Sequence, residues 1–473
     1  MSRTACLLML SLALPVFAAA PDDEGLPLTA ERVVEFDTDE ATWVSLDVSP
    51  DGQSLVIDVL GDLYLLPITG GTARPLTDGM AFDSQPRFSP DGARVAFVSD
   101  RDGAENVWVV EVDGTGAKKL SDNDGAAQFA SPAWAPDGSH VVASRTTWGL
   151  RTFEVWAYHL EGGRGIRLTR AKPEADTPAD RRGNSLGAVY GPDGRYLYYA
   201  YKTGGFAYNV QLPLWQIVRR DLRTGAEDPL TQAQGSAFRP LLSPDGRHLV
   251  YGSRFEGQTG LRLRDLQTGE DRWLVHPVTR DEQESRFTRD LLPGYAFTPD
   301  GTALVFARDG GIERLDLASG QTTRIPFSVR VSRGLGPQLQ FPRRLGLGPV
   351  KARLLRDPVM SPDGRRLAFS AFMRIHVRDL DGDGQRAVTP EGMTAFHPSW
   401  SPDGRWLTFV DWSASGGHVW RIRADGRGAP ERLTATRAYY TDPVYAPDGE
   451  RIVALRAPSH ERLYREWDFG APA

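Results

Sequence analysis

The amino-acid sequence predicts an all-β protein, a β-propeller of four-stranded antiparallel blades with nine repeat units. The tripeptide Pro-Asp-Gly occurs nine times. Consecutive copies are 40 to 63 residues apart, a period typical of propellers and related arrays. The chain is also rich in turn formers, with 49 Gly and 34 Pro among 473 residues. No segment has the pattern of a capped amphipathic helix.

The nine Pro-Asp-Gly turns each fit a hairpin between two strands. Pro presets φ for the second position of a type I turn, Asp can bond the backbone, and Gly takes the positive φ that follows. The turns begin at Pro50, Pro90, Pro136, Pro192, Pro244, Pro299, Pro362, Pro402 and Pro447.

The first two strands of each unit flank this turn. The first strand carries an apolar residue two positions before the Pro: Val48, Phe88, Trp134, Tyr190, Leu242, Phe297, Met360, Trp400 and Tyr445. The second strand has apolar residues three and five positions after the Gly, as in Leu55 and Ile57, and usually between them, as in Val56. A strand that is apolar on both faces is expected in a sheet stacked between two others.

A third and a fourth strand complete most units. The third usually closes on Asp: Val107–Asp113, Trp215–Asp221, Leu261–Asp265, Ile312–Asp316, Ile375–Asp379 and Val419–Asp425. The fourth often ends in Leu-Thr: Leu76-Thr77, Leu168-Thr169, Leu230-Thr231 and Leu433-Thr434. Four antiparallel strands per unit make a propeller blade.

The N-terminus has the pattern of a signal peptide over residues 1–18. Arg3 precedes an apolar run from Ala5 to Phe17, followed by small residues, and cleavage after Ala18 is expected. The run is too short for the ~20 residues of a membrane span. The chain is therefore expected to be periplasmic or secreted. The alternative is a stray apolar first helix.

Composition and charge exclude several classes of protein. A hydrophobic fraction of 40% and an aromatic fraction of 10% support a packed core and exclude a disordered chain. The net charge of −6 does not favour a polyanion ligand, so no nucleic-acid partner is predicted. The single cysteine, Cys6, excludes a disulfide framework and a cysteine-based zinc site.

The repeats suggest three parts after the signal peptide. Repeats one to six occupy residues 30–328, an irregular basic segment residues 329–356, and repeats seven to nine residues 357–470. Two arrangements remain open. In one, Arg32–Phe36 is a fourth-type strand that completes the last blade of a nine-unit ring, although propellers usually have four to eight blades. In the other, a six-unit propeller precedes an incomplete three-unit partner.

Three local motifs are candidate sites. Gly183–Gly187 matches Gly-x-Ser-x-Gly, but a repeat strand follows where a nucleophile elbow needs a helix, so a loop is predicted. Asp379–Gly384 resembles the start of a calcium loop, with Pro390 at the position of the EF-hand glutamate. A solvated turn is predicted there, with calcium as the alternative. The arginines and lysine of the basic segment predict a solvated linker or an interdomain contact: Arg330, Arg333, Arg343, Arg344, Lys351, Arg353 and Arg356.

Aromatic residues and insertions are the remaining binding candidates. Trp156 and Trp215 fall in third-strand positions and are expected in the core, whereas Trp148 is a better surface candidate than either, and Tyr208 is also considered. The long repeats carry insertions at Lys172–Arg182, Lys202–Tyr208 and Pro277–Asp290. Loops of one type emerge on one face of a propeller, where a binding function would reside.

The Phe/Trp-Ser-Pro-Asp-Gly-x-x-Leu-x-Phe pattern, from residue 45 to about 460, resembles the TolB-type propeller repeat of exported bacterial proteins. Phe36–Trp43, Gly61–Tyr64 and Phe206–Leu222 resemble the N-terminal propeller region of bacterial proteins that carry a metal-dependent amidohydrolase barrel downstream. Such a barrel needs a His-x-His pair, which none of the eight His forms. No catalytic, cofactor-binding or metal-binding residue is therefore predicted.

The favoured function is an exported interaction module without its own catalytic site, binding a protein, peptide or glycan. The alternative is the N-terminal propeller part of a metal-dependent amidohydrolase whose catalytic barrel is missing from this chain. A propeller enzyme with a channel metal, of the lactonase type, ranks last. It would need inward polar side chains converging on one ion, and no repeated polar residue is recognised at the start of the first strands.

Overall fold

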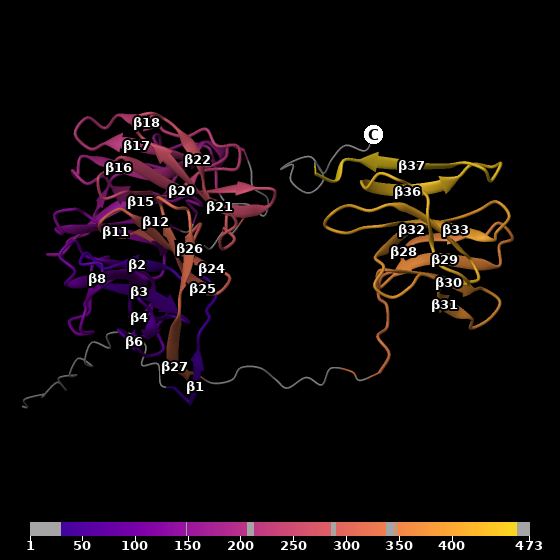
Figure 1. Cartoon of the computed structure of the whole chain (residues 1–473), viewed down its shortest axis with the longest axis horizontal. Coiled ribbons are helices and arrows are strands. Elements are labelled where there is room, and N and C mark those ends of the chain that lie inside the picture. The colour runs from indigo at the N-terminus through magenta and orange to yellow at the C-terminus, as the bar shows by residue number, and fades with distance from the viewer. Residues whose placement is uncertain are drawn as a thin grey trace, which may run out of the picture.

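The computed structural model describes residues 30–147, 149–205, 212–284, 290–336, 346 and 348–460 (Figure 1). The predicted signal peptide, Trp148 and Tyr208 lie outside these ranges. The predicted all-β fold is confirmed, because strands make up nearly all the regular structure and one 3-10 turn spans Ala179–Arg181. No helix within the described ranges has the length and apolar character needed to cross a bilayer.

The first six repeat units are six four-stranded antiparallel sheets. The first sheet contains β2 (Leu46–Val48), β3 (Ser54–Val59), β4 (Asp62–Pro67) and β6 (Arg74–Pro75). The second sheet contains β7 (Ser84–Phe88), β8 (Arg94–Ser99), β9 (Asn106–Glu111) and β10 (Lys118–Lys119). The third sheet contains β11 (Ala127–Trp134), β12 (His140–Thr147), β13 (Glu154–His159) and β14 (Ile166–Arg167). The fourth contains β15 (Gly183–Tyr190), β16 (Tyr196–Thr203), β17 (Gln216–Asp221) and β18 (Glu227–Pro229); the fifth β19 (Phe238–Leu242), β20 (His248–Phe255), β21 (Gln258–Asp265) and β22 (Asp271–Val275); the sixth β23 (Ala296–Phe297), β24 (Ala303–Arg308), β25 (Gly311–Asp316) and β26 (Thr322–Ile325).

The last three units form three further sheets, which we call the C-terminal arc. They contain β28 (Arg356–Met360), β29 (Arg366–Ala371), β30 (Arg374–Asp379) and β31 (Gln385–Ala387); β32 (Ala395–Trp400), β33 (Trp406–Asp411), β34 (Val419–Arg423) and β35 (Glu431–Arg432); and β36 (Tyr439–Tyr445) with β37 (Ile452–Ala457). Strand β32 contacts both β28 and β36, so the sheets stack in sequence order. Among the described residues, each of the nine Pro-Asp-Gly turns joins the first and second strands of one sheet.

The first six sheets close on one another, and we call them the six-sheet ring. Strand β2 of the first sheet contacts β23 and β24 of the sixth. The turns repeat this closure. A Cβ placed on the Gly of any ring turn would lie 3.2 to 4.0 Å from the Pro of the preceding turn, and Gly52 of the first turn meets Pro299 of the sixth. The contacts are those of a six-unit ring, while the exact domain boundaries given above remain a prediction.

The hairpin turns are held by side-chain hydrogen bonds as well as by backbone geometry. In the first turn the Ser49 hydroxyl donates to Asp51 Oδ1 at 2.5 Å and accepts from the Ser54 amide at 2.9 Å, while Gly52 has φ +70°. In the turn at Pro402, hydrogen bonds lower the pKa of Asp403 to about 2. The bond from the Ser401 hydroxyl has the largest effect, and the bond from the Arg405 amide has the next largest. In the six turns where Ser or Thr precedes the Pro, its hydroxyl therefore bonds to both sides of the turn, whereas Ala135, Gly191 and Ala446 hold this position in the other three.

The Leu-Thr ending of the fourth strand also has a structural reason. The Thr77 hydroxyl accepts a hydrogen bond at 2.9 Å from the amide of Leu63 in the third strand. The same bond recurs from Val155 to Thr169, Ile217 to Thr231, Ile375 to Thr389 and Val419 to Thr434. The hydroxyl thus satisfies a buried amide where the backbone ladder ends.

The structure corrects two predictions at the ends of the ring. Residues Arg32–Phe36 are not a fourth strand of a blade. They belong to β1 (Arg32–Thr38), which pairs antiparallel with β27 (Phe327–Leu335), and β27 also pairs in parallel with the two-residue β5 (Gly71–Thr72). The predicted irregular segment is therefore a strand up to residue 335.

An alternating pattern explains this extra sheet. Phe327, Val329 and Val331 are buried on one face of β27. The intervening Arg330 stays exposed and forms ion pairs at 3.2 Å with Glu35 and Asp37 of β1. This period of two is a strand signal, but it lies outside the Pro-Asp-Gly repeat and was missed for that reason.

Burial of Glu105 makes ring stability depend on pH. Its carboxylate accepts a hydrogen bond from the Phe129 amide of β11, and desolvation raises its pKa from 4.5 to about 7. Between these values the folded state binds more protons than the unfolded state, so stability falls as pH rises. Between pH 4.5 and pH 7.5 the unfolding free energy of the unmodified protein should fall by about 3 kcal/mol, and Glu105→Gln should remove this fall. Urea unfolding of both proteins at each pH measures this, and parallel stability–pH curves would contradict it.

Candidate functional site

The first strands share a feature five positions before each Pro. In seven of the nine units the strand pairing shifts here. The residue at the shift has positive φ, between 51° and 71°, in Gln85, Ser131, Gly187, Arg239, Asp357, His397 and Asp442. A bulge of this kind re-aims a side chain out of the strand. The two remaining units carry Ser45 and Gly294 there.

This repeated position corrects the sequence analysis, which recognised no polar residue recurring at the start of the first strands. None of the nine residues is apolar. A comparison of the repeats position by position would have shown it. The signal was missed because the residue types differ from one unit to the next: seven have polar side chains of different size and charge, and two are glycines.

In the six-sheet ring these polar groups meet in a buried network. Arg239 of β19 forms an ion pair with Asp290 at 3.0 Å, with only 4% and 1% of the two side chains exposed. The Ser131 hydroxyl of β11 donates to the same carboxylate, and the Ser131 amide donates to the Gln85 side chain at 2.7 Å. The backbone amide of Gln85 in turn donates to Asp58 Oδ2 at 2.9 Å. Residues of several sheets are thus tied together by one network.

A second, partly buried ion pair lies beside the first. Arg87 Nη1 is 3.4 Å from Asp47 Oδ1 and donates to the Leu46 carbonyl at 3.2 Å. Burial, together with the neighbouring Arg239, lowers the pKa of Arg87 to about 10. Burial also raises the pKa of Asp47. Buried charges of this kind are stable only when paired, so this network is structural.

In the C-terminal arc the same repeat position is open to solvent. His397 Nδ1 of β32 lies 3.2 Å from Asp442 Oδ1 of β36 and 4.0 Å from Asp357 Oδ2 of β28. Three successive sheets therefore bring an imidazole between two carboxylates. Asp442 is 60% exposed at its side chain, so the group is accessible to a ligand. Within the described ranges no three His, Cys, Asp or Glu side chains are arranged to hold a metal ion.

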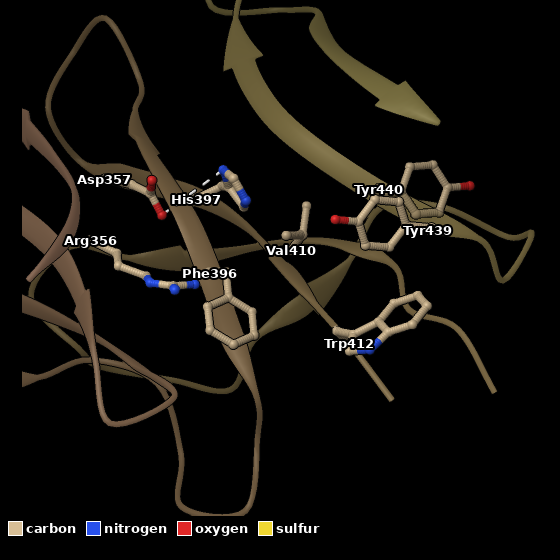
Figure 2. Close-up of a pocket in the computed structure, with 8 residues that line it drawn as sticks. All are labelled: Arg356, Asp357, Phe396, His397, Val410, Trp412, Tyr439 and Tyr440. Atoms are coloured by element: carbon tan, nitrogen blue, oxygen red, sulfur yellow. Dashed lines mark ion pairs between the residues drawn. The ribbon is translucent and has the colours of Figure 1, made fainter. Parts of the chain in front are cut away.

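A cavity of about 550 Å³ lies beside these residues (Figure 2). It is lined by Arg356, Asp357, Phe396, His397, Val410, Trp412, Tyr439 and Tyr440. Figure 2 shows the charged groups at one end and three aromatic rings at the other. Trp412 and Tyr439 pack edge to face with ring centres 4.9 Å apart, and Tyr440 is fixed by a 2.9 Å hydrogen bond to the Thr436 carbonyl. Ligand pockets typically combine apolar walls with a few polar groups in this way.

Comparison with known proteins shows which propeller proteins this chain is similar to. Residues 47–186 match the family described as the tricorn protease N-terminal beta propeller domain. Tricorn protease homolog 1 of Streptomyces coelicolor is 25% identical over 498 residues, covering 89% of this chain and 45% of that protein. The chain is a β-propeller protein of the TolB/tricorn type. This confirms the resemblance predicted from the Pro-Asp-Gly repeat.

Other relatives of this TolB/tricorn-type protein match over shorter stretches or by fold. The uncharacterized peptidase YuxL of Bacillus subtilis is 30% identical over 189 residues, covering 39% of this chain and 24% of that protein. The chain thus spans less than half the length of these two curated relatives. A putative TolB from Agrobacterium tumefaciens has 21% identity and a TM-score of 0.43, over 56% of this chain and 87% of the other. A tricorn protease structure has 14% identity and a TM-score of 0.45, over 92% and 39%.

The motifs singled out in the sequence lie elsewhere in this TolB/tricorn-type fold. Gly183–Gly187 was predicted to be a loop, but it forms the first part of strand β15. The chain continues as a strand where a nucleophile elbow needs a helix. In Asp379–Gly384 the Asp379 amide donates to the Gly384 carbonyl at 2.8 Å, which closes a turn. Trp215 is buried in the core as predicted, and half-buried Trp156 packs against a core cluster.

The three predicted insertions emerge at one end of the ring. Strands alternate in direction, so connections into a first strand and from a second to a third strand lie opposite the Pro-Asp-Gly turns. Lys172–Arg182 leads into β15, Pro277–Asp290 leads towards β23, and Lys202–Tyr208 leaves β16. Residues 206–208 and 285–289 are outside the described ranges. Asp290 reaches the buried network, so part of one insertion is structural.

Proposed function

We propose that this protein is an exported interaction module that binds peptide segments at the cavity of the C-terminal arc. The observation that carries the proposal is the cavity itself, where Asp357, His397 and Asp442 adjoin a wall of aromatic rings. In the ring, the residue five positions before each Pro is buried and bonded within the protein. In the C-terminal arc, the same repeat position is exposed beside a cavity of about 550 Å³. Export is supported by the signal-peptide pattern of residues 1–18.

The chemistry of the cavity favours a peptide with a basic side chain. Asp357 lines the cavity, and Asp442 lies beside it on His397, so two carboxylates stand against one permanently charged arginine, Arg356. Trp412 and Tyr439 offer ring faces to the aliphatic stem and the charge of an arginine or lysine. Aromatic residues are also those that contribute most to binding energy in protein interfaces.

Fluorescence anisotropy with labelled hexapeptides tests the proposal. Three peptides should differ at one central residue, which is Arg, Glu or Leu. The Arg peptide should bind most tightly, and its affinity should fall with added salt because the attraction is partly electrostatic. Trp412→Ala should weaken its binding about tenfold, the effect of losing a central aromatic contact of somewhat more than 1 kcal/mol. Asp442→Asn should have a smaller effect, mainly at low salt.

The matched control is Trp156→Ala, which removes another half-buried tryptophan, in β13 of the ring. It should leave peptide affinity unchanged. Equal loss in both tryptophan variants, or equal affinity for all three peptides, would contradict the assignment of the cavity as a peptide site.

The second candidate is the propeller part of a larger hydrolase. This candidate is favoured because the chain matches only part of each curated relative named above. The match covers 45% of the tricorn protease homolog and 24% of the uncharacterized peptidase. We propose a peptidase partner domain on this ground, and an amidohydrolase domain on the resemblance of the opening segments. A reading frame for either domain directly downstream in the genome would support this candidate.

A further inference from the structure

Among the residues that the structure describes, no sheet covers either outer face of the C-terminal arc, whereas every ring sheet has a neighbour on both faces. The residue two before each Pro packs against the preceding sheet. In the ring, Phe88 of the second sheet packs in one cluster with Val56 of the first. Met360 holds this position in the seventh unit, where no described sheet precedes it, and it is 53% exposed. Trp400, the same position within the arc, is buried.

The opposite face is open in the same way. The residue four after each Gly packs against the following sheet, as Val56 does. It is buried in each of the first eight units: Val56, Ala96, Val142, Tyr198, Val250, Val305, Ala368 and Thr408. In the ninth unit it is Val453, which is 69% exposed. Val444 and Leu455 beside it are exposed as well.

The arc has the same sheet-to-sheet geometry as the ring. Trp400 Nε1 donates to the carbonyl of Val359 in the preceding sheet at 3.1 Å, and Trp134 Nε1 donates to the equivalent Arg87 carbonyl at 3.0 Å in the ring. A Cβ on Gly404 or Gly449 would lie 3.8 Å from the preceding Pro, within the ring's range, while Gly364 has nothing within 4 Å. Since six sheets at this spacing close a circle, three sheets describe about half of one.

We propose that the arc associates with the arc of a second copy of this chain, so that two half-circles complete one ring of six sheets. The Met360 face of each copy packs on the Val453 face of the other. This contact is heterologous, but it closes after two copies because each arc turns through about half a circle, so no open filament forms. The completed ring places Asp357, His397 and Asp442 of both copies around one channel.

Light scattering coupled to size-exclusion chromatography tests the proposal on the full mature chain. The expected mass is twice that of one chain. Val453→Glu and Met360→Lys should each shift the population to monomer by placing a charge in an apolar contact, with the circular dichroism spectrum unchanged. The control Ile166→Glu, on an exposed strand of the ring, should remain dimeric. A monomeric mass for the unmodified chain, or an unchanged mass for both face variants, would overturn the proposal.

A crosslink distinguishes the closed dimer from other assemblies. Met360→Cys combined with Val453→Cys should be joined between copies by a short bismaleimide crosslinker, because the equivalent Phe88 and Val56 lie in one cluster across two stacked sheets of the ring. The expected product of the crosslinking reaction is a covalent dimer. A ladder of higher polymers, or no crosslink at all, would overturn closure by two copies.

Discussion

Asp290→Ala should destabilise the six-sheet ring by about 3–5 kcal/mol, the cost of removing one partner of a buried ion pair. The substitution leaves the Arg239 guanidinium, 4% exposed, without its 3.0 Å partner. It also removes the acceptor of the Ser131 hydroxyl bond. Because these groups come from different sheets, the loss should weaken the contacts that hold the ring closed. Urea unfolding monitored by tryptophan fluorescence measures the change in free energy.

An exposed ion pair provides the matched control. Asp228 pairs with Arg219 at 2.9 Å, and 60% and 35% of the two side chains are exposed. Asp228→Ala should therefore cost less than about 1 kcal/mol. Similar losses for Asp290→Ala and Asp228→Ala would show that the buried network does not stabilise the ring.

Trp215→Ala should also cost about 3–5 kcal/mol, the range for emptying a large aromatic site in a core. The indole is 1% exposed and lies in the largest hydrophobic cluster, with Phe153, Leu186 and Phe238 from neighbouring parts of the ring. Lys202 Nζ lies 5.6 Å from the ring centre, so the substitution also removes a cation–π contact. Thermal and urea unfolding both report the loss.

The control for this substitution is an exposed apolar residue. Ile166→Ala removes a side chain that is already in water, so its effect should be within about 0.5 kcal/mol. Peptide binding gives a second readout. Trp215→Ala should leave affinity for the Arg peptide unchanged while the protein is folded, in contrast to Trp412→Ala. Loss of binding at full folding would show that Trp215 contributes to the site.

Much of the fold follows from local features that a sequence displays directly. Ser49, Asp51 and Gly52 define a turn through bonds within a few residues, and each turn predicts the two strands beside it. Val56 lies in a strand that is apolar on both faces, which indicates sheets on both sides. The strand at Arg32–Phe36 was predicted but assigned to the wrong sheet, and β27 was missed, because both lie outside the repeat and are far apart in the chain.

The candidate site was not predicted, although its residues were visible. His397 alone suggests no chemistry, and Asp357 and Asp442 are 40 and 45 residues away from it in sequence. They meet because each occupies the same bulge in successive sheets. The equivalent Ser131 and Arg239 are buried, so the repeat position alone does not decide whether the group is structural or accessible.

The sequence by itself determined the repeat unit, its turn chemistry and the all-β fold, because these depend on contacts within about 40 to 60 residues of chain. Only the tertiary structure decided that six sheets close together while three remain an open arc. Closure depends on the small rotation between stacked sheets, which side-chain packing sets and no single repeat encodes. That rotation also decides which polar bulges are buried as a network and which face a cavity.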